Sequence, residues 1–598
     1  MLTIRPLRLQ TLLGTALLLA LATAPVQAQV GTGTLLTPAE SSGWETLSAH
    51  ADVTAFYRQL QVRSPEVRVL HLGTSREGRE LLTVTLARPA VTTPAEAHAT
   101  GKPIVFIAAQ VHGDEPGGKE GLMLFARELA LGSLQGLLDD VVFVFVPQIN
   151  PDGAESGTWG TRTNPSGYNL NRDYSRLDNP EIRALVNQGL VWWEPHVVVD
   201  AHEAQGPPRY YDFYTSYPRN HGAPQLENLL EAEIVPALVD ALGDAGFTHY
   251  FYHIVPGGIA QVVREAATRP GADPRNYLEL PQELQDSLPP ISFGGNGTRS
   301  LSAYGGPHGA ITLLYESLRR RDSRIDIERR AQMHYVAMEG LARYVAGNSS
   351  KVLGAVADAR EHMTAQGARW SEADSIPVTW ESYVTRNQPY MLVVDGDTVE
   401  VNIPIRDGRR PEDQRIRPEG YLIESHRGDI AEHLALHGVV VERLLEPATV
   451  EVESFRVDSV TRSGPNEGFI PRNFTVSLES QTLEVPAGTW IARSAQKRAG
   501  LLFHWMEPEG ADSYASGGWF INHEGVGNVF PVHRIRAPAK HSYEISSHNN
   551  HLSRLQSLRR IEMAETPAKR PRILADGSIL SNTRLRTPSA IRQITNPA

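Results

Sequence analysis

Four apolar runs most constrain the fold of this 598-residue chain. They span residues 104–109, 141–146, 197–199 and 311–315, and each is predominantly apolar on both faces. Strands buried on both faces belong to mainly parallel sheets. Residues 121–131 lie between the first two runs and place apolar side chains at helical spacing, which predicts a strand–helix–strand unit. We therefore predict an α/β fold, in which helices flank a mainly parallel mixed sheet.

A polar side chain follows each of these runs. His112 comes after the first run and Asn150 after the second. His202 comes after the third run, and Glu316 directly follows the fourth. Ligands of open α/β sheets bind at the carboxyl ends of the strands. The sequence thus predicts one site at this edge of the sheet.

The site has residues suited to a zinc ion. The chain has no cysteine, so histidine and carboxylate must hold any metal. His112 and Glu115 are three residues apart, and with His202 they complete a three-ligand shell that leaves one position open for water. A carboxylate outside this shell would be the general base. In the alternative interpretation, His112 and Glu115 are a solvated loop pair and His202 is a structural residue.

Polar loops lie between the ligand segments, at 150–153, 160–164 and 169–173. They contain asparagine and arginine, which are suitable donors for a substrate carboxylate and a developing oxyanion. The alternative interpretation is a long loop of turn and capping residues, because asparagine, aspartate and glycine favour turns.

Six motifs, taken in order, resemble those of the carboxypeptidase A-type zinc metallocarboxypeptidases. They are HGDE at 112–115, NPDG at 150–153, TRTN at 161–164, NLNRD at 169–173, DAHE at 200–203 and LLYES at 313–317. The resemblance runs from Thr37 to Val345. It implies that His112, Glu115 and His202 bind zinc. It also implies that Arg162 polarises the oxyanion and that Glu316 is the general base.

The resemblance further implies that Asn171 and Arg172 bind the terminal carboxylate of the substrate. Asp114 departs from the pattern, because many digestive members carry an arginine there, and we expect a different subsite polarity. Tyr304, next to two glycines, is our candidate for the mobile active-site tyrosine of the family. The specificity pocket is expected between residues 250 and 304.

The first 28 residues predict a signal peptide. Arg5 and Arg8 form a positive region, residues 12–22 are apolar, and a small-x-small pattern ends at Ala28. The apolar stretch is about half the roughly 20 residues that span a bilayer. We expect cleavage after Ala28, a secreted or periplasmic protein and no stable membrane insertion. The alternative is an uncleaved anchor.

The rest of the chain divides by composition. We predict a zinc peptidase catalytic domain at 29–345, an appended β-rich domain at 352–540 and a basic, disordered tail at 552–598. Asp395-Gly396 predicts a hairpin turn, and Gly438 ends a predicted helix at 431–436. The formal net charge of −11 argues against a nucleic-acid partner.

The sequence predicts a secreted zinc-dependent metallocarboxypeptidase that acts on peptides or proteins. Glu316 would serve as base while zinc-activated water attacks the C-terminal peptide bond. One alternative is a zinc-dependent deacylase or amidase that acts on acylated amino acids or cell-wall peptides, because such substrates also carry a free carboxylate beside the amide. A further alternative is a non-catalytic binding module.

Overall fold

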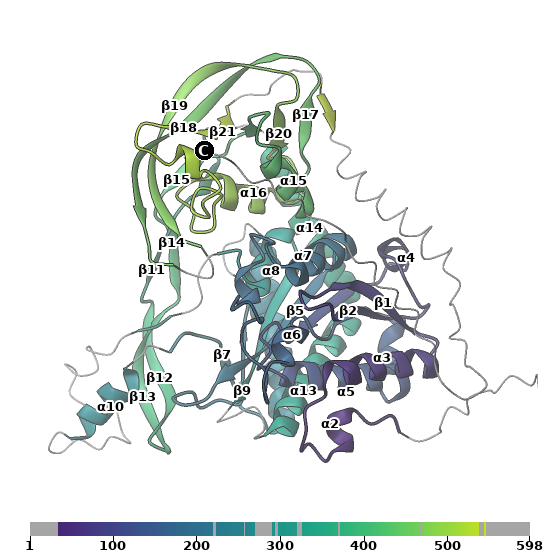
Figure 1. The fold of residues 1–598 in the computed structure, drawn as a ribbon. Coiled ribbons are helices and arrows are strands. Elements are labelled where there is room, and N and C mark those ends of the chain that lie inside the picture. The colour runs from purple at the N-terminus through teal and green to yellow at the C-terminus, as the bar shows by residue number, and fades with distance from the viewer. Residues whose placement is uncertain are drawn as a thin grey trace, which may run out of the picture.

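A computed structural model describes residues 34–218, 223–255, 258–268, 290–292, 297–319, 326–368, 371–465, 469–536 and 543–545. The predicted signal peptide and basic tail lie outside these residues. An N-terminal α/β part is followed by a β-rich C-terminal region, which lies over one end and along one side of it (Figure 1). Across the described residues, no helix combines the length and apolarity that crossing a bilayer requires.

The α/β part is built on an eight-stranded sheet in the order β1-β2-β4-β3-β5-β9-β6-β7. The four central strands β4, β3, β5 and β9 are mutually parallel, while β2 and β6 flank them in antiparallel orientation. This arrangement confirms the predicted fold class. The strands are β1 Val67–Thr74, β2 Glu80–Leu86, β3 Ile104–Ala109, β4 Val142–Val146, β5 Val197–Gln205, β6 Phe213–Ser216, β7 His249–Phe251 and β9 Ile311–Arg319.

Both faces of the sheet are covered, which explains why β3 is apolar at every position. Val105 and Ile107 belong to a core that includes Phe125 of helix α5. Phe106 and Ala108 point the other way, into a second core. Burying each larger apolar side chain stabilises the folded state by about 1.5–3 kcal/mol. A strand whose side chains enter two cores is therefore strongly stabilised.

Helices and short turns connect these strands. The α-helices of this part are α2 Pro38–Ser41, α3 His50–Arg63, α4 Pro94–Ala99, α5 Gly117–Leu131, α6 Pro151–Ala154, α7 Pro180–Ala184, α8 Pro224–Leu229, α9 Val235–Asp244, α10 Ile259–Ala267, α12 Leu301–Tyr304, α13 Ile327–Gly347 and α14 Ser349–Ala368. Shorter 3₁₀ and π elements are η1 Gln135–Asp139, η2 Leu170–Arg172, η3 Leu185–Val191, η4 Leu230–Ile234 and η6 Gly306–His308. Helix α14 was not predicted from the sequence.

The C-terminal region contains a seven-stranded sheet, β19-β18-β21-β16-β20-β17-β22. The predicted hairpin is present between β12 and β13, and Asp395 and Gly396 form its turn with φ angles of 53° and 95°. The elements are β10 Ser375–Pro377, β11 Trp380–Tyr383, β12 Arg386–Val394, β13 Asp397–Arg406, β14 Gly408–Pro411, β15 Gln414–Ile416, β16 Gly420–Ile423, α15 Gly428–Leu436, β17 Glu442–Leu444, β18 Ala448–Arg462, β19 Arg472–Val485, β20 Trp490–Arg493, α16 Ala499–Met506, η7 Ile521–His523, β21 Val529–Ile535 and β22 Tyr543–Ile545.

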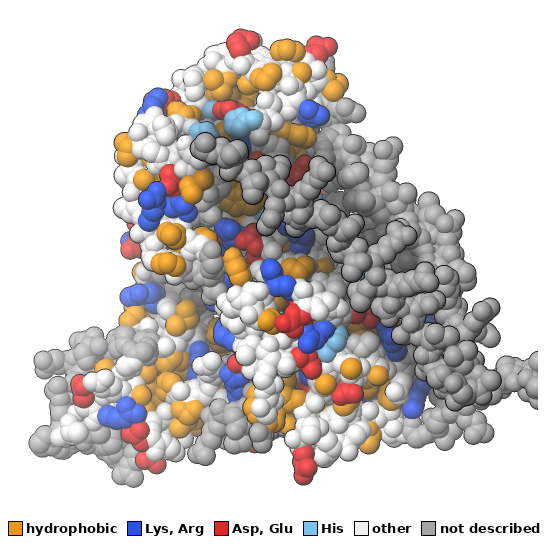
Figure 2. All heavy atoms as spheres, viewed as in Figure 1, with side chains coloured by type: hydrophobic (Ala, Val, Ile, Leu, Met, Phe, Trp, Pro, Cys, Tyr) orange, Lys and Arg blue, Asp and Glu red, His pale blue; other side chains and the backbone are white. Residues whose placement is uncertain are grey.

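This C-terminal region is packed against the α/β part. Strand β13 pairs in parallel with β8, Ile291–Ser292, from the α/β part. The second core includes Ile430 and Trp505 as well as the residues of β3. On the face shown in Figure 2, acidic and basic side chains are interspersed. The C-terminal region and the α/β part therefore share one strand pairing and one hydrophobic core.

Candidate active site

The HGDE motif occupies the loop between β3 and α5. Gln110 leaves the strand with a φ of 54°, which turns the chain sharply. Gly113 packs so closely on the NPDG motif that a Cβ atom there would lie 2.2 Å from the carbonyl carbon of Gly153. Glycine is thus required at 113, and its close packing fixes His112 and Glu115 at the end of the strand.

Three donor atoms converge at this point. His112 Nδ1 lies 2.9 Å from Glu115 Oε1, and His202 Nδ1 lies 2.8 Å from Glu115 Oε2. The two Nδ1 atoms are 3.2 Å apart. All three side chains are buried, and their donor atoms lie within 4.8 Å of one another. Among the described residues, His112, Glu115 and His202 form the group of side chains whose donor atoms lie close enough together to bind one metal ion.

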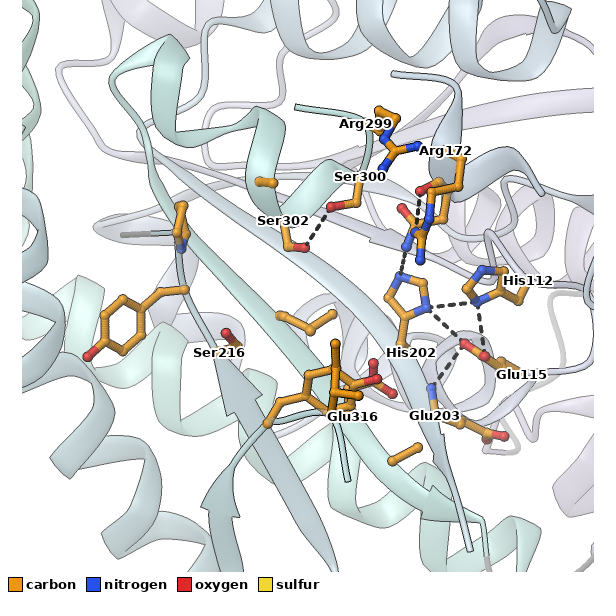
Figure 3. Close-up of a pocket in the computed structure, with 18 of the residues that line it drawn as sticks. His112, Glu115, Arg172, His202, Glu203, Ser216, Arg299, Ser300, Ser302 and Glu316 are labelled. Carbon is orange, nitrogen blue, oxygen red and sulfur yellow. Dashed lines mark hydrogen bonds and ion pairs between the residues drawn. The ribbon is translucent and has the colours of Figure 1, made fainter. Parts of the chain in front are cut away.

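The outer ring nitrogens have partners that orient both imidazoles. His112 Nε2 lies 3.1 Å from Asn169 Oδ1, and His202 Nε2 lies 2.9 Å from Asp200 Oδ1. Such partners favour the proton on Nε2 and leave the lone pair of Nδ1 directed at the centre, as zinc-bound histidine requires (Figure 3). The donor set therefore fits Zn²⁺, with two nitrogens and one carboxylate.

The charge of Glu115 also suits a ligand. Burial raises the pKa of its carboxyl group, but the neighbouring rings of His112 and His202 outweigh burial and hold this pKa well below its usual range. Arg162 Nη1 adds a contact at 2.9 Å from Glu115 Oε1. Glu115 is therefore an anion wherever the protein is folded near neutral pH.

Helix α13 supports the strand that carries His202. His334 Nε2 lies 3.0 Å from the carbonyl oxygen of His202. Arg330, fully buried, pairs with Glu203 at 2.5 Å. Of the two acidic residues near His202 in the sequence, Asp200 is the one whose carboxylate contacts the ring of His202. Glu203 instead links β5 to α13 through its ion pair with Arg330.

Glu316 lies inside β9 and lines the same cleft. Burial raises the pKa of its carboxyl group to about 8, with a further contribution from the charge of Glu115 and an opposing one from His202. Arg319, three residues further along β9, pairs instead with Asp114, whose Oδ2 lies 3.2 Å from Arg319 Nη1. Glu316 is consequently available for proton transfer.

The cleft has a volume of about 530 Å³. It is lined by seven of the predicted site residues, namely His112, Glu115, Arg162, Asn171, Arg172, His202 and Glu316. Asn171 and Arg172 come from η2, and Asn171 Nδ2 lies 3.3 Å from His202 Nε2. The structure therefore brings together the residues predicted as metal donors, general base and anion-binding groups, from segments that are far apart in the sequence.

Tyr304 lies outside this cleft, contrary to its prediction as the active-site tyrosine. Its side chain is fully buried, and its hydroxyl group lies 2.6 Å from Nδ1 of His437 in the C-terminal region. Helix α12 directs Tyr304 into the second core. Two tyrosines do line the cleft, Tyr217 and Tyr252, and the pKa of Tyr252 is raised chiefly by the charge of Glu316 and also by burial.

Tyr252 and Arg299 were not predicted from the sequence, although both line the cleft. No motif marks either residue, and β7, which precedes Tyr252, is only three residues long. The one indication was their position between residues 250 and 304, where a specificity pocket was expected.

Comparison with known proteins gives one family match. Residues 53–189 match the family model described as zinc carboxypeptidase. This segment contains His112, Glu115, Arg162, Asn171 and Arg172, whereas His202 and Glu316 lie beyond it.

Several curated proteins are similar over longer or shorter stretches. Carboxypeptidase 2 of Trichophyton rubrum is 23% identical over 470 residues, which cover 77% of this chain and 81% of that protein. Carboxypeptidase E of Caenorhabditis elegans is 33% identical over 179 residues, which cover 27% of this chain and 37% of that protein. Among solved structures, a metallo-carboxypeptidase from Burkholderia cenocepacia is 20% identical with a TM-score of 0.36, covering 50% of this chain and 70% of its own.

Proposed function

We propose that this chain, a member of the zinc carboxypeptidase family, is a secreted or periplasmic enzyme that removes the C-terminal residue of peptides or proteins. One observation carries the proposal. Asn171 and Arg172, which suit a free carboxylate, line the same cleft as the three donors and Glu316. A substrate held by its terminal carboxylate would therefore place its last peptide bond near the metal centre.

The ligand residues are His112, Glu115 and His202. Zinc bound there would supply a Lewis acid that activates water and stabilises negative charge on the scissile carbonyl oxygen. The buried, oriented donor set described above would hold the ion without rearrangement of the strand ends. Side chains of the protein would perform the remaining tasks, which are substrate binding, oxyanion stabilisation and proton transfer.

Arg172 would bind the terminal carboxylate through two parallel hydrogen bonds, with Asn171 as a further donor. Arg172 directly follows Asn171, whose Nδ2 lies 3.3 Å from His202 Nε2, so the bound carboxylate and the metal centre would be neighbours. Arg162, exposed over 41% of its side chain, would stabilise the developing oxyanion. An internal peptide bond offers no carboxylate for Arg172, which favours exopeptidase cleavage.

Glu316 would accept a proton from the attacking water and then donate it to the leaving amine. Burial raises the pKa of this carboxyl group without metal, and a zinc ion held close by would lower that pKa and favour the carboxylate that accepts the proton. The same burial keeps bulk water away from the transferred proton.

The products formed from a mixed peptide library test this proposal. The purified, zinc-loaded protein should shorten free peptides one residue at a time from the carboxyl end, as read by mass spectrometry. The Glu316→Gln variant should leave the library intact under the same conditions. Internal fragments, or activity confined to acylated amino acids, would contradict carboxypeptidase function and favour the deacylase alternative.

A further inference from the structure

One wall of the cleft lies directly beside the residues proposed to bind the terminal carboxylate. Asn171 Oδ1 accepts a hydrogen bond from the backbone N–H of Leu301 at 3.3 Å. The backbone N–H of Tyr174 donates to the carbonyl oxygen of Arg299 at 3.2 Å. In a substrate, the carboxylate and the last side chain are attached to the same Cα atom. The last side chain would therefore face the wall formed by residues 297–303.

Arg299 is the charged residue of that wall, whose sequence is Gly-Thr-Arg-Ser-Leu-Ser-Ala. It lines the cleft with the small residues Ser300, Ser302 and Ala303, and 30% of its side chain is exposed. Figure 3 shows Arg299 near Arg172, on the side of His202 that faces away from Glu316. Small neighbours leave space next to a permanent positive charge.

The C-terminal region holds Arg299 in place. Asp512, buried to all but 2% of its side chain, contacts Arg299 Nε at 2.8 Å. The other Asp512 oxygen accepts the backbone N–H of Thr298, and Trp505 Nε1 donates to Thr298 Oγ1 at 2.9 Å. A guanidinium has five N–H donors, more than one carboxylate uses, so the pair with Asp512 orients Arg299 without exhausting its donors.

The charges along the cleft favour an anionic ligand. Five arginines line it, namely Arg162, Arg172, Arg209, Arg299 and Arg409. Three acidic residues line it, namely Glu316, Glu115 of the metal donor set, and Glu203, which pairs with Arg330. This excess of positive charge contrasts with the formal charge of −11 for the whole chain.

We propose that Arg299 is a specificity-determining residue that selects substrates whose C-terminal residue has an acidic side chain, and that Asp512 is its positioning residue. This inference rests on the proposed function, because it assumes that Arg172 binds the terminal carboxylate. It also gives the C-terminal region a role in substrate choice. Asp512 acts through Arg299 and touches no reacting atom.

Two peptides that differ only in a final glutamate or glutamine test the inference, because the two side chains match in size and differ in charge. Their binding to the zinc-loaded Glu316→Gln variant is measured by calorimetry, and their hydrolysis by the native protein is measured as kcat/KM. The glutamate peptide should be favoured by about tenfold or more in both measurements, as expected for a hydrogen bond between two charged groups. Binding remains readable even if neither peptide is hydrolysed, so failure of the proposed function is distinguished from failure of this inference.

Three variants locate the source of the preference. Arg299→Gln should remove it, and Arg299→Lys should retain part of it. Asp512→Asn should weaken binding of the glutamate peptide, seen as a higher KM with little change in kcat, and leave the glutamine peptide unaffected. Arg176→Gln is the matched control, because Arg176 donates to the carbonyl oxygen of Gly517 and so links the same two parts of the protein outside the cleft.

The control should keep the full preference for glutamate. Equal binding of the two peptides by the parent protein, or no binding of either, would overturn the inference. An undiminished preference in Arg299→Gln would overturn the role of Arg299. A stronger preference in Asp512→Asn would show that Asp512 neutralises Arg299, and would overturn its positioning role.

Discussion

Glu316 on β9 lies directly opposite His202 on β5 in the register of these two parallel strands. The pairing places the proposed base beside a proposed zinc ligand, although the residues belong to distant segments of the chain. Side chains alternate between the faces of a strand, so a shift of β9 by one residue would move Glu316 to the opposite face. The hydrogen-bond register of the sheet therefore sets the geometry of the site.

Replacing the proposed base should separate catalysis from metal binding. Glu316→Gln keeps the volume of the side chain but cannot accept a proton, so we expect peptide hydrolysis to fall by about 10²–10⁴-fold or more. Zinc content, measured by elemental analysis, should stay at one ion per chain. The matched control is Glu361→Gln on the exposed side of α14, which should retain full activity. Near-normal turnover in zinc-loaded Glu316→Gln would remove Glu316 from the mechanism.

Loss of one ligand should reduce the metal content. His202→Ala removes a buried donor, and we expect sharply reduced zinc by elemental analysis after dialysis. Native protein should also melt at a higher temperature with zinc than after chelation, because a ligand that binds the folded state stabilises it. His71→Ala is the control, since His71 is 45% exposed and lies outside the site. Full zinc content in His202→Ala would show that the ligand assignment is wrong.

The contact between the two parts of the protein should give a measurable dependence on pH. Burial raises the pKa of Glu194, but Arg498 and Lys497 of the C-terminal region outweigh it and lower the pKa to about 2. This stabilisation is present above the unfolded-state pKa of about 4.5 and is lost as the pH falls toward 2. Glu194→Gln should therefore lower the free energy of unfolding by about 1–2 kcal/mol at pH 7.

Melting temperatures measured between pH 7 and pH 2 check this prediction. The difference between the native protein and Glu194→Gln should shrink through the acid range and vanish near pH 2. Asp395→Asn is the control, because it alters an exposed pair with Arg264 and should have little effect. A constant difference at every pH would contradict an electrostatic origin.

Local patterns were sufficient to predict the central part of the fold. The strand β3 is apolar at every position because each face meets a core, and this continuous run is what identified a parallel sheet. Asp395-Gly396 forms the predicted hairpin turn, because both residues adopt positive φ angles. The candidate ligands are recognisable because His112 and His202 each come shortly after such an apolar run in the sequence.

Long-range packing accounts for what the sequence did not reveal. Thr298 and Asp512, which join the cleft wall to the C-terminal region, are 214 positions apart and carry no shared motif. Tyr304 was misplaced because its position next to two glycines suggested a mobile loop, whereas its hydroxyl group is fixed by His437. Helix α14 has little contrast between its faces in composition, so periodicity did not mark it.

Paired peptides that end in a free carboxylate or an amide give the most direct test of carboxypeptidase function. Arg172 lines the cleft, and a cation left without its carboxylate partner should disfavour the amidated peptide by about 10²-fold or more in kcat/KM. Arg172→Ala should raise KM for the free peptide and narrow the gap. Equal rates on free and amidated peptides by the native, zinc-loaded protein would contradict the account.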